Sequence, residues 1–313
     1  MSSGRALLLP PEASGQRYDH AVREALAAAG HESSAREVRQ ALREGRIRVE
    51  GRRAAPGARA RGGESIELGE FVPRSEATIR AEPELLLTLR VLFEDPTILA
   101  LDKPSGIPTH PLAHDEASTL LGAAVAHDPA IARAGPPLEG GLVHRLDRGT
   151  SGVVIFAKDV ATRDRLRDAF ARGRIEKRYR ALVFDPERRL VAGQVLQGAI
   201  APAADPRRVE VVDGDSAGAL AARTEIVAVS PGRAGWAWVE VQAHTGRRHQ
   251  IRAHLASVGA PIGGDPLYGS AAPDRAGLSR LALHAASVRL PDGPFIEAPL
   301  PADLVALERE DRT

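Results

Sequence analysis

The sequence predicts an α+β protein in which a small basic domain precedes a larger domain. Three observations lead to this expectation. Segments with the pattern of strands outnumber those with the pattern of helices, and the two kinds do not alternate as they do in doubly wound sheets. Prolines punctuate residues 73–87, and the composition differs on either side of that stretch. Nine arginines and only three acidic residues lie between Ala35 and Arg61.

The composition is that of an ordinary globular protein, and 313 residues suit two domains. The net charge is only +1, so the distribution of charge matters more than its total. The absence of cysteine excludes disulfides, thiolate zinc sites and cysteine nucleophiles, and it suits the cytoplasm. No segment approaches the ~20 apolar residues of a membrane span, and the apolar run near the N-terminus is too short for a signal peptide. We therefore expect a cytoplasmic protein without membrane association.

The first part of the chain is predicted to be a flexible tail over residues 1–14 and a compact domain over residues 15–72. A helical pattern runs from Asp19 to Ala29 and ends at a glycine. A second helix, capped by Ser33 or Ser34, carries apolar residues on one face and ends at another glycine. Short strands are expected around residues 47–49 and 66–68.

The concentration of arginines in this domain predicts a surface that binds phosphate, although a merely solvated arginine-rich face is the alternative. The order helix, turn, helix and then Val49-Glu50-Gly51 resembles the S-four RNA-binding domain, in which the turn is usually Val-Asn-Gly. Contacts to phosphate and shape should dominate, since the helices carry no aromatic stripe. The candidate RNA-binding residues are Arg36, Arg39, Arg43, Arg46, Arg48, Arg52 and Arg53.

Residues 73–87 are predicted to be a linker, and residues 88–313 the larger domain. Apolar patterns predict two helices, over residues 159–172 and 247–258. A stretch rich in Ala, Pro, Asp and Gly predicts a loop over residues 201–218. Strands are expected at residues 91–93, 98–101, 153–157, 179–184, 224–229 and 236–243.

Asp147 is the first candidate for a chemical role. It lies between Arg145 and Arg148, in a glycine-rich segment that leads into a buried strand. Loops held by a rigid strand often carry catalytic groups, and adjacent cations favour the ionised carboxylate. Such a group can act as a base, a nucleophile or a metal ligand. A structural aspartate bonded to nearby backbone amides is an equal alternative.

The segment from His244 to Leu255 supplies further candidates. Arg248 and Arg252 are four residues apart, so they share one face of the helix expected over residues 247–258. Like charges at that spacing indicate a neighbouring anion, which is Asp147, RNA phosphate or both, although surface arginines in water are the alternative. Three histidines in this segment are spaced by five residues, about 140° apart around a helix at each step, so they cannot share one metal ion. We expect no metal site.

Tyr179 is the third candidate, at the start of a predicted strand. It either fills the core or presents a ring on which a base can stack.

Taken together, these segments are similar to the RluA-type pseudouridine synthase family over residues 88–303. Residues His144–Gly152 match its His-Arg-Leu-Asp-x-x-Thr-Ser-Gly signature, and Lys177–Val183 match Lys-x-Tyr-x-Ala-Leu-Val. Residues Thr245–Gly269 match a long block that begins Thr-Gly-Arg-x-His-Gln-Ile-Arg. Leu101–Gly106 resembles the family's first motif, with Asp102 where asparagine is more frequent. An S-four-like domain is a common companion in this family.

The resemblance implies a mixed, mainly antiparallel sheet with a central active-site cleft. It also implies isomerisation of uridine to pseudouridine in RNA, without cofactor or metal. By the same resemblance, Asp147 is the catalytic aspartate and Arg252 its basic partner. Tyr179 is the ring that packs on the uracil and is also a candidate for assisting the removal of the proton from carbon five. Further candidates for binding the substrate are His144, Arg145, Thr150, Arg247, His249 and Gln250.

Large-subunit ribosomal RNA is the expected substrate and partner, and we expect a monomer. Transfer RNA is the alternative substrate, and an inactive RNA-binding or ribosome-assembly protein is the alternative class. The sequence does not choose between Asp147 as a nucleophile and Asp147 as the base that starts glycal formation.

Overall fold

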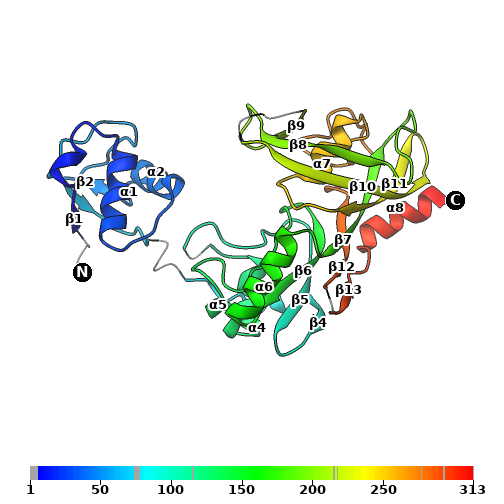
Figure 1. Ribbon diagram of the computed structural model, residues 1–313, viewed down its shortest axis with the longest axis horizontal. Coiled ribbons are helices and arrows are strands. Elements are labelled where there is room, and N and C mark those ends of the chain that lie inside the picture. The colour runs from blue at the N-terminus through cyan, green and yellow to red at the C-terminus, as the bar shows by residue number, and fades with distance from the viewer. Residues whose placement is uncertain are drawn as a thin grey trace. The chain divides into compact units, whose positions relative to one another are not determined.

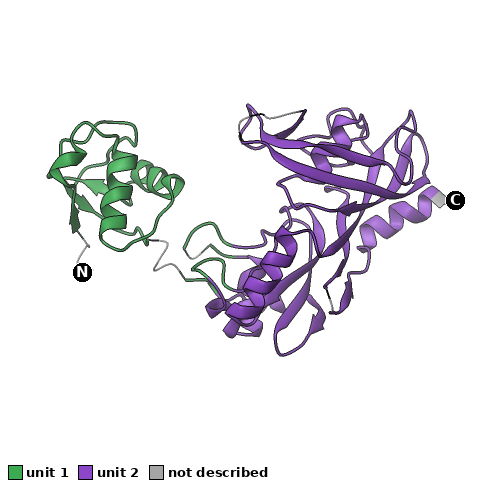
Figure 2. Ribbon diagram, viewed as in Figure 1, with its two compact units in different colours: residues 1–80, 111–117, 136–140 green, residues 81–110, 118–135, 141–313 purple. Residues whose placement is uncertain are grey.

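The computed structural model describes residues 6–73, 78–114, 116–213, 216, 218–275, 277–291 and 293–312. The chain forms two compact units (Figure 2). The small unit comprises residues 1–80, 111–117 and 136–140, and the large unit comprises the remainder. Within the described ranges, no helix has both the length and the apolar character needed to cross a bilayer.

The small unit packs two helices, α1 (Tyr18–Ala28) and α2 (Ala35–Glu44), around a core with a three-stranded sheet. The sheet is antiparallel, in the order β1 (Ala6–Leu8), β3 (Ser65–Glu67) and β2 (Arg48–Val49). A short 3-10 helix, η1 (Pro11–Ala13), follows β1. Residues 6–13 therefore belong to the folded unit rather than to a flexible tail, because β1 pairs with β3 and Leu9 is buried in the core.

Local sequence explains both ends of α2. The Ser34 hydroxyl accepts a hydrogen bond from the amide of Glu37, and the Glu37 carboxylate accepts one from the amide of Ser34, which together form a capping box. The helix ends at Gly45, whose φ of 76° is left-handed and favours glycine. Its buried face carries Val38 and Leu42.

The large unit is built on a ten-stranded sheet (Figure 1). Its order is β4-β5-β6-β12-β7-β11-β10-β8-β9, and β13 pairs with β12. The β6–β12 pair is parallel and the other pairs are antiparallel, which confirms the predicted α+β class with a mainly antiparallel sheet. The strands are β4 (Arg90–Glu94), β5 (Ile98–Lys103), β6 (Ser151–Ala157), β7 (Glu176–Phe184), β8 (Val195–Pro202), β9 (Val209–Val212), β10 (Leu220–Pro231), β11 (Trp236–Ala243), β12 (Leu283–Arg289) and β13 (Phe295–Glu297).

Six helices of the described chain belong to the large unit: α3 (Pro83–Leu86), α4 (Leu120–His127), α5 (Ala130–Arg133), α6 (Val160–Ala171), α7 (Gln250–Ser257) and α8 (Ala302–Arg312). α6 packs on β6 and α4 on β5, whereas α7 packs on β8, β9 and β10. One part of the core surrounds β7 and β11, and another surrounds β6 and α6. The segment that carries Asp147 leads into β6, which lies between β5 and β12 in the sheet (Figure 1).

Two predictions of local structure were wrong. Residues 201–218 contain β9 and the end of β8 rather than a loop alone. The helix expected from Arg247 begins at Gln250, because His249 has a φ of 52°, a left-handed conformation that an α-helix cannot include.

Candidate active site

Lys103 holds the backbone of the segment that carries Asp147. The Lys103 side chain is fully buried, and its Nζ donates to the carbonyl oxygens of Pro104 at 2.9 Å, Arg148 at 3.0 Å and Thr150 at 2.9 Å. Burial lowers the pKa of Lys103 to about 7, while the nearby Asp147 acts in the opposite direction. The three carbonyl acceptors favour the ammonium form. No role for Lys103 was predicted from the sequence, although a lysine that ends an apolar strand is a sign of a buried charge.

Asp147 forms an ion pair with Arg252. The Nη1 atom of Arg252 lies 3.0 Å from Oδ2 of Asp147. Among the residues that the structure describes, no backbone amide donates to this carboxylate, so the alternative of a purely local structural aspartate is not supported. The Asp147 side chain is 28% exposed and the Arg252 side chain 6%. A buried arginine from α7 therefore meets a carboxylate that remains accessible.

Asp265 fixes the orientation of Arg252. Its two oxygens accept hydrogen bonds from Nε and Nη2 of Arg252, at 2.7 and 2.8 Å. The carboxylate is fully buried and also accepts bonds from the amides of Leu267 and Tyr268. Burial acts to raise the pKa of Asp265, but these bonds outweigh it and hold the pKa below its usual value. Asp265 was not among the residues predicted from the sequence, because nothing in the long matching block that contains it indicates its role.

The charges of Asp147 and Asp265 act together on Arg252. Burial acts to lower its pKa, but the hydrogen bonds and charges of the two carboxylates outweigh that effect and raise it. The planar guanidinium uses one edge for Asp265 and leaves Nη1 for Asp147, which a flexible ammonium could not reproduce.

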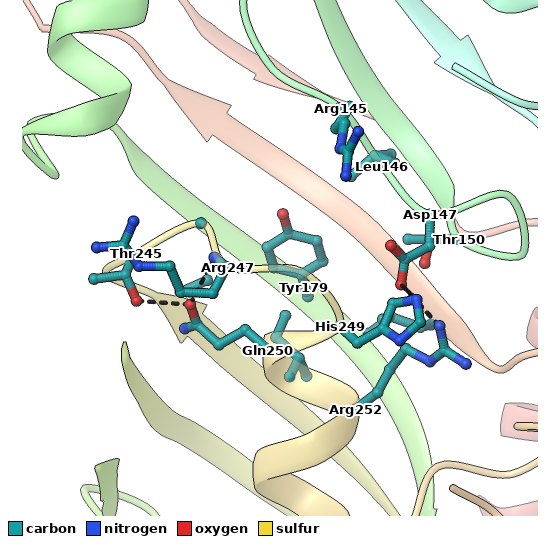
Figure 3. Close-up of a pocket in the computed structure, with 14 residues that line it drawn as sticks. Arg145, Leu146, Asp147, Thr150, Tyr179, Thr245, Arg247, His249, Gln250 and Arg252 are labelled. Carbon is teal, nitrogen blue, oxygen red and sulfur yellow. Dashed lines mark hydrogen bonds and ion pairs between the residues drawn. The ribbon is translucent and has the colours of Figure 1, made fainter. Parts of the chain in front are cut away.

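Tyr179 on β7 lines the same cavity as Asp147 (Figure 3). The residue as a whole is half-buried. Burial, and secondly the charge of Asp147, raise the pKa of the phenol well above its ordinary value, so the hydroxyl stays protonated at neutral pH. The cavity is lined by Arg145, Leu146, Asp147, Thr150, Tyr179, Ala243, Thr245, Gly246, Arg247, His249, Gln250, Ile251, Arg252 and Leu283.

His249 lies beside the ion pair, with Nε2 3.8 Å from Oδ2 of Asp147. Its Nδ1 is 3.1 Å from the hydroxyl of Tyr268, and that hydroxyl also accepts a bond from the amide of Val209. The guanidinium of Arg252 lies 5.1 Å from the centre of the Tyr268 ring. Tyr268 thus connects His249, Arg252 and strand β9, a role that sequence analysis did not assign.

The other predicted substrate-binding residues differ in their exposure and in whether their polar groups are already hydrogen-bonded. Arg145 and Arg247 are exposed at the cavity. Thr150 is buried beneath it. Both amide hydrogens of Gln250 are bonded, to the Arg223 carbonyl and the Thr224 hydroxyl, and its carbonyl accepts bonds from Thr245 and Arg247.

Two predicted residues do not line this cavity. His144 accepts a bond from the amide of Ile155 and stacks on Phe170, with ring centres 4.5 Å apart. Arg248 does not share a helical face with Arg252, because it precedes α7, and it donates to the carbonyls of Pro206 and Arg207. Across the described ranges, no group of three His, Cys, Asp or Glu side chains is placed to hold a metal ion.

The arginines of the small unit form a different kind of site. On α2, the helical period places Arg36, Arg39 and Arg43 on one face, opposite the buried Val38 and Leu42. All three are exposed. In the described part of the chain, neither Arg36 nor Arg43 has an ion pair, and Arg39 approaches Asp19 only at 3.9 Å. The other candidates, Arg46, Arg48, Arg52 and Arg53, follow in the segment after the helix.

Comparison with known proteins agrees with both units. The family model for RNA pseudouridylate synthase matches residues 97–257, and that for the S4 domain matches residues 24–66. These matches define an RNA-modifying isomerase with an attached RNA-binding domain. The chain belongs to the RNA pseudouridylate synthase family, whose members convert uridine to pseudouridine in RNA.

Individual relatives and solved structures support this assignment. The chain is 32% identical to "Ribosomal large subunit pseudouridine synthase D" of Pseudomonas aeruginosa, over 76% of this chain and 78% of that protein. It is 33% identical to the protein of that name from Nitrosomonas europaea, over 71% of this chain but only 64% of the relative. The solved structure "Human RNA Pseudouridylate Synthase Domain Containing 4" is similar with a TM-score of 0.57 and 25% identity, over 74% of this chain and 96% of that one.

Proposed function

We propose that this protein isomerises uridine to pseudouridine in large-subunit ribosomal RNA, with Asp147 as the catalytic carboxylate. The observation that carries the proposal is the accessible Asp147 carboxylate, paired with a buried arginine in the cavity that Tyr179 also lines. The names of the bacterial relatives favour ribosomal RNA over transfer RNA as the substrate.

In this reaction the bond between ribose C1′ and ring N1 breaks, and a bond between C1′ and C5 forms. The proton on C5 leaves, and N1 gains one. The uridine first leaves its stack, at a cost of a few kcal/mol, and less in a loop or bulge. The Asp147 carboxylate then either attacks C1′ or removes the ribose proton that starts glycal formation.

Arg252 keeps Asp147 ionised and oriented, since an opposite charge at hydrogen-bond distance favours the carboxylate. The two hydrogen bonds from Arg252 to the buried Asp265 carboxylate fix the direction in which its Nη1 atom points at Asp147. The ring of Tyr179 packs on the uracil. Its raised pKa favours this packing role over that of an anionic base.

The decisive experiment is a map of pseudouridine in total RNA from cells with and without the gene, complemented by wild-type protein or by Asp147→Asn. We expect sites in large-subunit ribosomal RNA that wild type restores. The nearly isosteric Asn should fold normally and restore none. Sites only in transfer RNA would replace the proposed substrate, no sites at all would favour an RNA-binding protein, and turnover by the Asn variant would reject Asp147.

We also propose that residues 6–72 form a separate RNA-binding domain, joined by residues 73–80 to a catalytic domain over residues 81–313, because β1 pairs within the small unit and α3 packs on α4 in the large unit. The buried core cluster of the small unit draws only on residues from Leu9 to Phe71, so its removal takes nothing from the cores of the large unit. Deleting residues 1–72 should weaken RNA binding and flatten its dependence on salt, while the fluorescence of Trp236 and Trp238 still reports a cooperative unfolding transition. An unchanged salt dependence would contradict the proposed role.

A further inference from the structure

A second cavity adjoins the one that holds Asp147. The two share Arg145, Tyr179, Thr245, Gly246 and Arg247. Asp147, His249 and Arg252 line only the first cavity. The second is lined in addition by Val143, His144, Phe170, Ala171 and Lys177. A group bound there would therefore contact residues that also line the cavity of the candidate catalytic carboxylate, Tyr179 among them.

The lining of the second cavity has one sign of charge. Arg145, Lys177 and Arg247 are cationic, and none of the described lining residues is acidic. Burial, and secondly Lys177, lower the pKa of the His144 imidazole to about 3, so it is neutral at physiological pH. The cations are therefore not balanced within the cavity, which makes it a place for an anion.

Lys177 is the unusual member of this group. It lies two residues before Tyr179 on β7, so both side chains leave the same face of the sheet. Only 5% of the residue is exposed. Its Nζ donates to the carbonyl oxygen of Thr245 at 3.2 Å and lies 5.7 Å from the centre of the Phe170 ring. Across the described ranges, no carboxylate is within ion-pair distance.

This environment stabilises an ammonium poorly. An ammonium has three donors, and the protein supplies one carbonyl and the face of a ring. Burial, and secondly the charge of Arg247, lower the pKa of Lys177 to about 8. A buried charge without a counterion reduces the stability of a protein, so Lys177 is better explained by a ligand than by the fold. Lys158 is the contrast, because Glu94 and Asp128 lie 2.6 and 3.4 Å from its Nζ.

The ammonium is also approachable from the loop between β11 and α7. A Cβ atom added at Gly246 would lie 4.0 Å from Nζ of Lys177. The glycine therefore leaves uncovered a position directly beside the buried charge. Arg247, the next residue, is exposed at the rim.

We infer that the second cavity is a subsite for an RNA phosphodiester group next to the target uridine, held by Lys177 together with Arg145 and Arg247. The inference rests on the proposed function, since it places this phosphate beside a uridine bound in the first cavity. A phosphate there supplies the counterion that Lys177 lacks and fixes the RNA strand in the cavity next to the one that holds Asp147. Binding energy from this contact positions the flipped nucleotide.

The test compares Lys177→Met with Lys158→Met in the full chain. The RNA is a short hairpin that carries a uridine found by the pseudouridine map. For Lys177→Met, the slope of log affinity against log salt should fall by about 0.7, the value for one lost contact to a single strand. If wild type and variant bind equally at 1 M salt, this difference in slope makes the affinity of the variant about fivefold weaker than that of wild type at 0.1 M salt. Lys158→Met, which removes a lysine outside both cavities, should leave the slope unchanged.

Thermal unfolding separates ligand binding from a structural role. If Lys177 serves a ligand, Lys177→Met should unfold at the same temperature as wild type or higher. A lower unfolding temperature with an unchanged salt slope would overturn the inference. So would weaker binding with an unchanged slope, which would indicate recognition of a base edge.

A second measurement locates the phosphate. Single neutral methylphosphonates replace, in turn, the phosphates that flank the target uridine. One position should weaken binding to wild type and have no further effect on Lys177→Met. If no position behaves in this way while wild type still modifies the RNA, the subsite is rejected and the proposed function stands. If no RNA is modified in the mapping experiment, the proposed function itself fails.

Discussion

The arginines of the two units show opposite uses of the same side chain. On α2 of the small unit, Arg36 and Arg43 are exposed and have no ion pair within the described residues. In the large unit, Arg252 is buried and makes three hydrogen bonds to two carboxylates. The exposed arginines create a positive potential over a surface. Arg252 instead directs one N–H group at one oxygen atom of Asp147. Orientation should therefore matter far more for Arg252 than for any single arginine on α2.

The difference follows from the surroundings of each group. Exposed charges are screened by salt over about 8 to 10 Å and are free to follow the shape of a partner. A guanidinium fixed by a buried carboxylate is screened less, and it cannot rearrange without breaking bonds.

The largest effect is expected from Arg252→Lys. Lysine keeps the charge but cannot bond both oxygens of Asp265 while also contacting Asp147. We expect the turnover rate at saturating RNA to fall by about 100-fold or more, since misplacement of a catalytic group by about 1 Å has an effect of that order. RNA affinity should change little. The measurement is the initial rate of pseudouridine formation.

Arg180→Lys is the matched control. Arg180 pairs with Glu308 at 2.6 Å and does not line the cavity. This variant should retain turnover within a few fold. If Arg252→Lys and Arg180→Lys lose turnover to the same extent, the orientation of the Arg252 guanidinium does not determine turnover. The contrast between the two units would then have no support.

The sequence predicted one side of this contrast better than the other. The helical period and the charge of α2 are local properties, and so are the caps at Ser34 and Gly45, so they could be read directly. The residues Asp147, Tyr179 and Arg252 were found through matching motifs, and the structure brings all three to one cavity. Their roles in catalysis stay predictions.

What the sequence did not reveal depends on contacts distant along the chain. Asp265 and Lys103 act only because folding brings them to Arg252 and to the Asp147 segment. Helix α4 went unpredicted because six consecutive residues, Leu120–Val125, are buried, which leaves no amphipathic period. Strand β9 lies in a segment whose composition favours turns, but pairing with β8 overrides that preference.

The two units should also differ in their response to acid. His284 is fully buried, and its ring is bonded to the Ser151 hydroxyl and the Ala298 carbonyl. Burial lowers its pKa from 6.5 to about 4, against a smaller opposing effect of the Ala298 carbonyl. The imidazole of His284 is therefore protonated more readily in the unfolded chain than in the folded protein. The stabilising contribution is fully present above pH 6.5 and is lost as the pH falls towards 4. Among the described residues of the small unit, no histidine is buried.

Urea unfolding followed by tryptophan fluorescence measures this effect in the full chain, since Trp236 and Trp238 both belong to the large unit. Between pH 7 and 4.5, the protonation of His284 should account for roughly 2 to 3 kcal/mol of lost stability. His284→Gln should be less stable at pH 7 but should lose less on acidification. His20→Gln, at an exposed position of α1, should match wild type. Equal losses for wild type and His284→Gln would show that other groups dominate.

The smallest effect is expected from single substitutions on α2. Arg43→Gln keeps helix propensity and removes one exposed charge. We expect RNA affinity to fall by less than about tenfold and the salt slope to fall by about 0.7 to 0.9, the contribution of one phosphate contact. Turnover at saturating RNA should be unchanged, and Arg165→Gln on α6, outside both cavities, should leave affinity and slope as in wild type.

In the triple variant of Arg36, Arg39 and Arg43, the losses should add, because diffuse charges act independently. A single arginine that alone removed most of the affinity would mean that α2 uses a fixed contact, as the large unit does, and the contrast between the units would disappear.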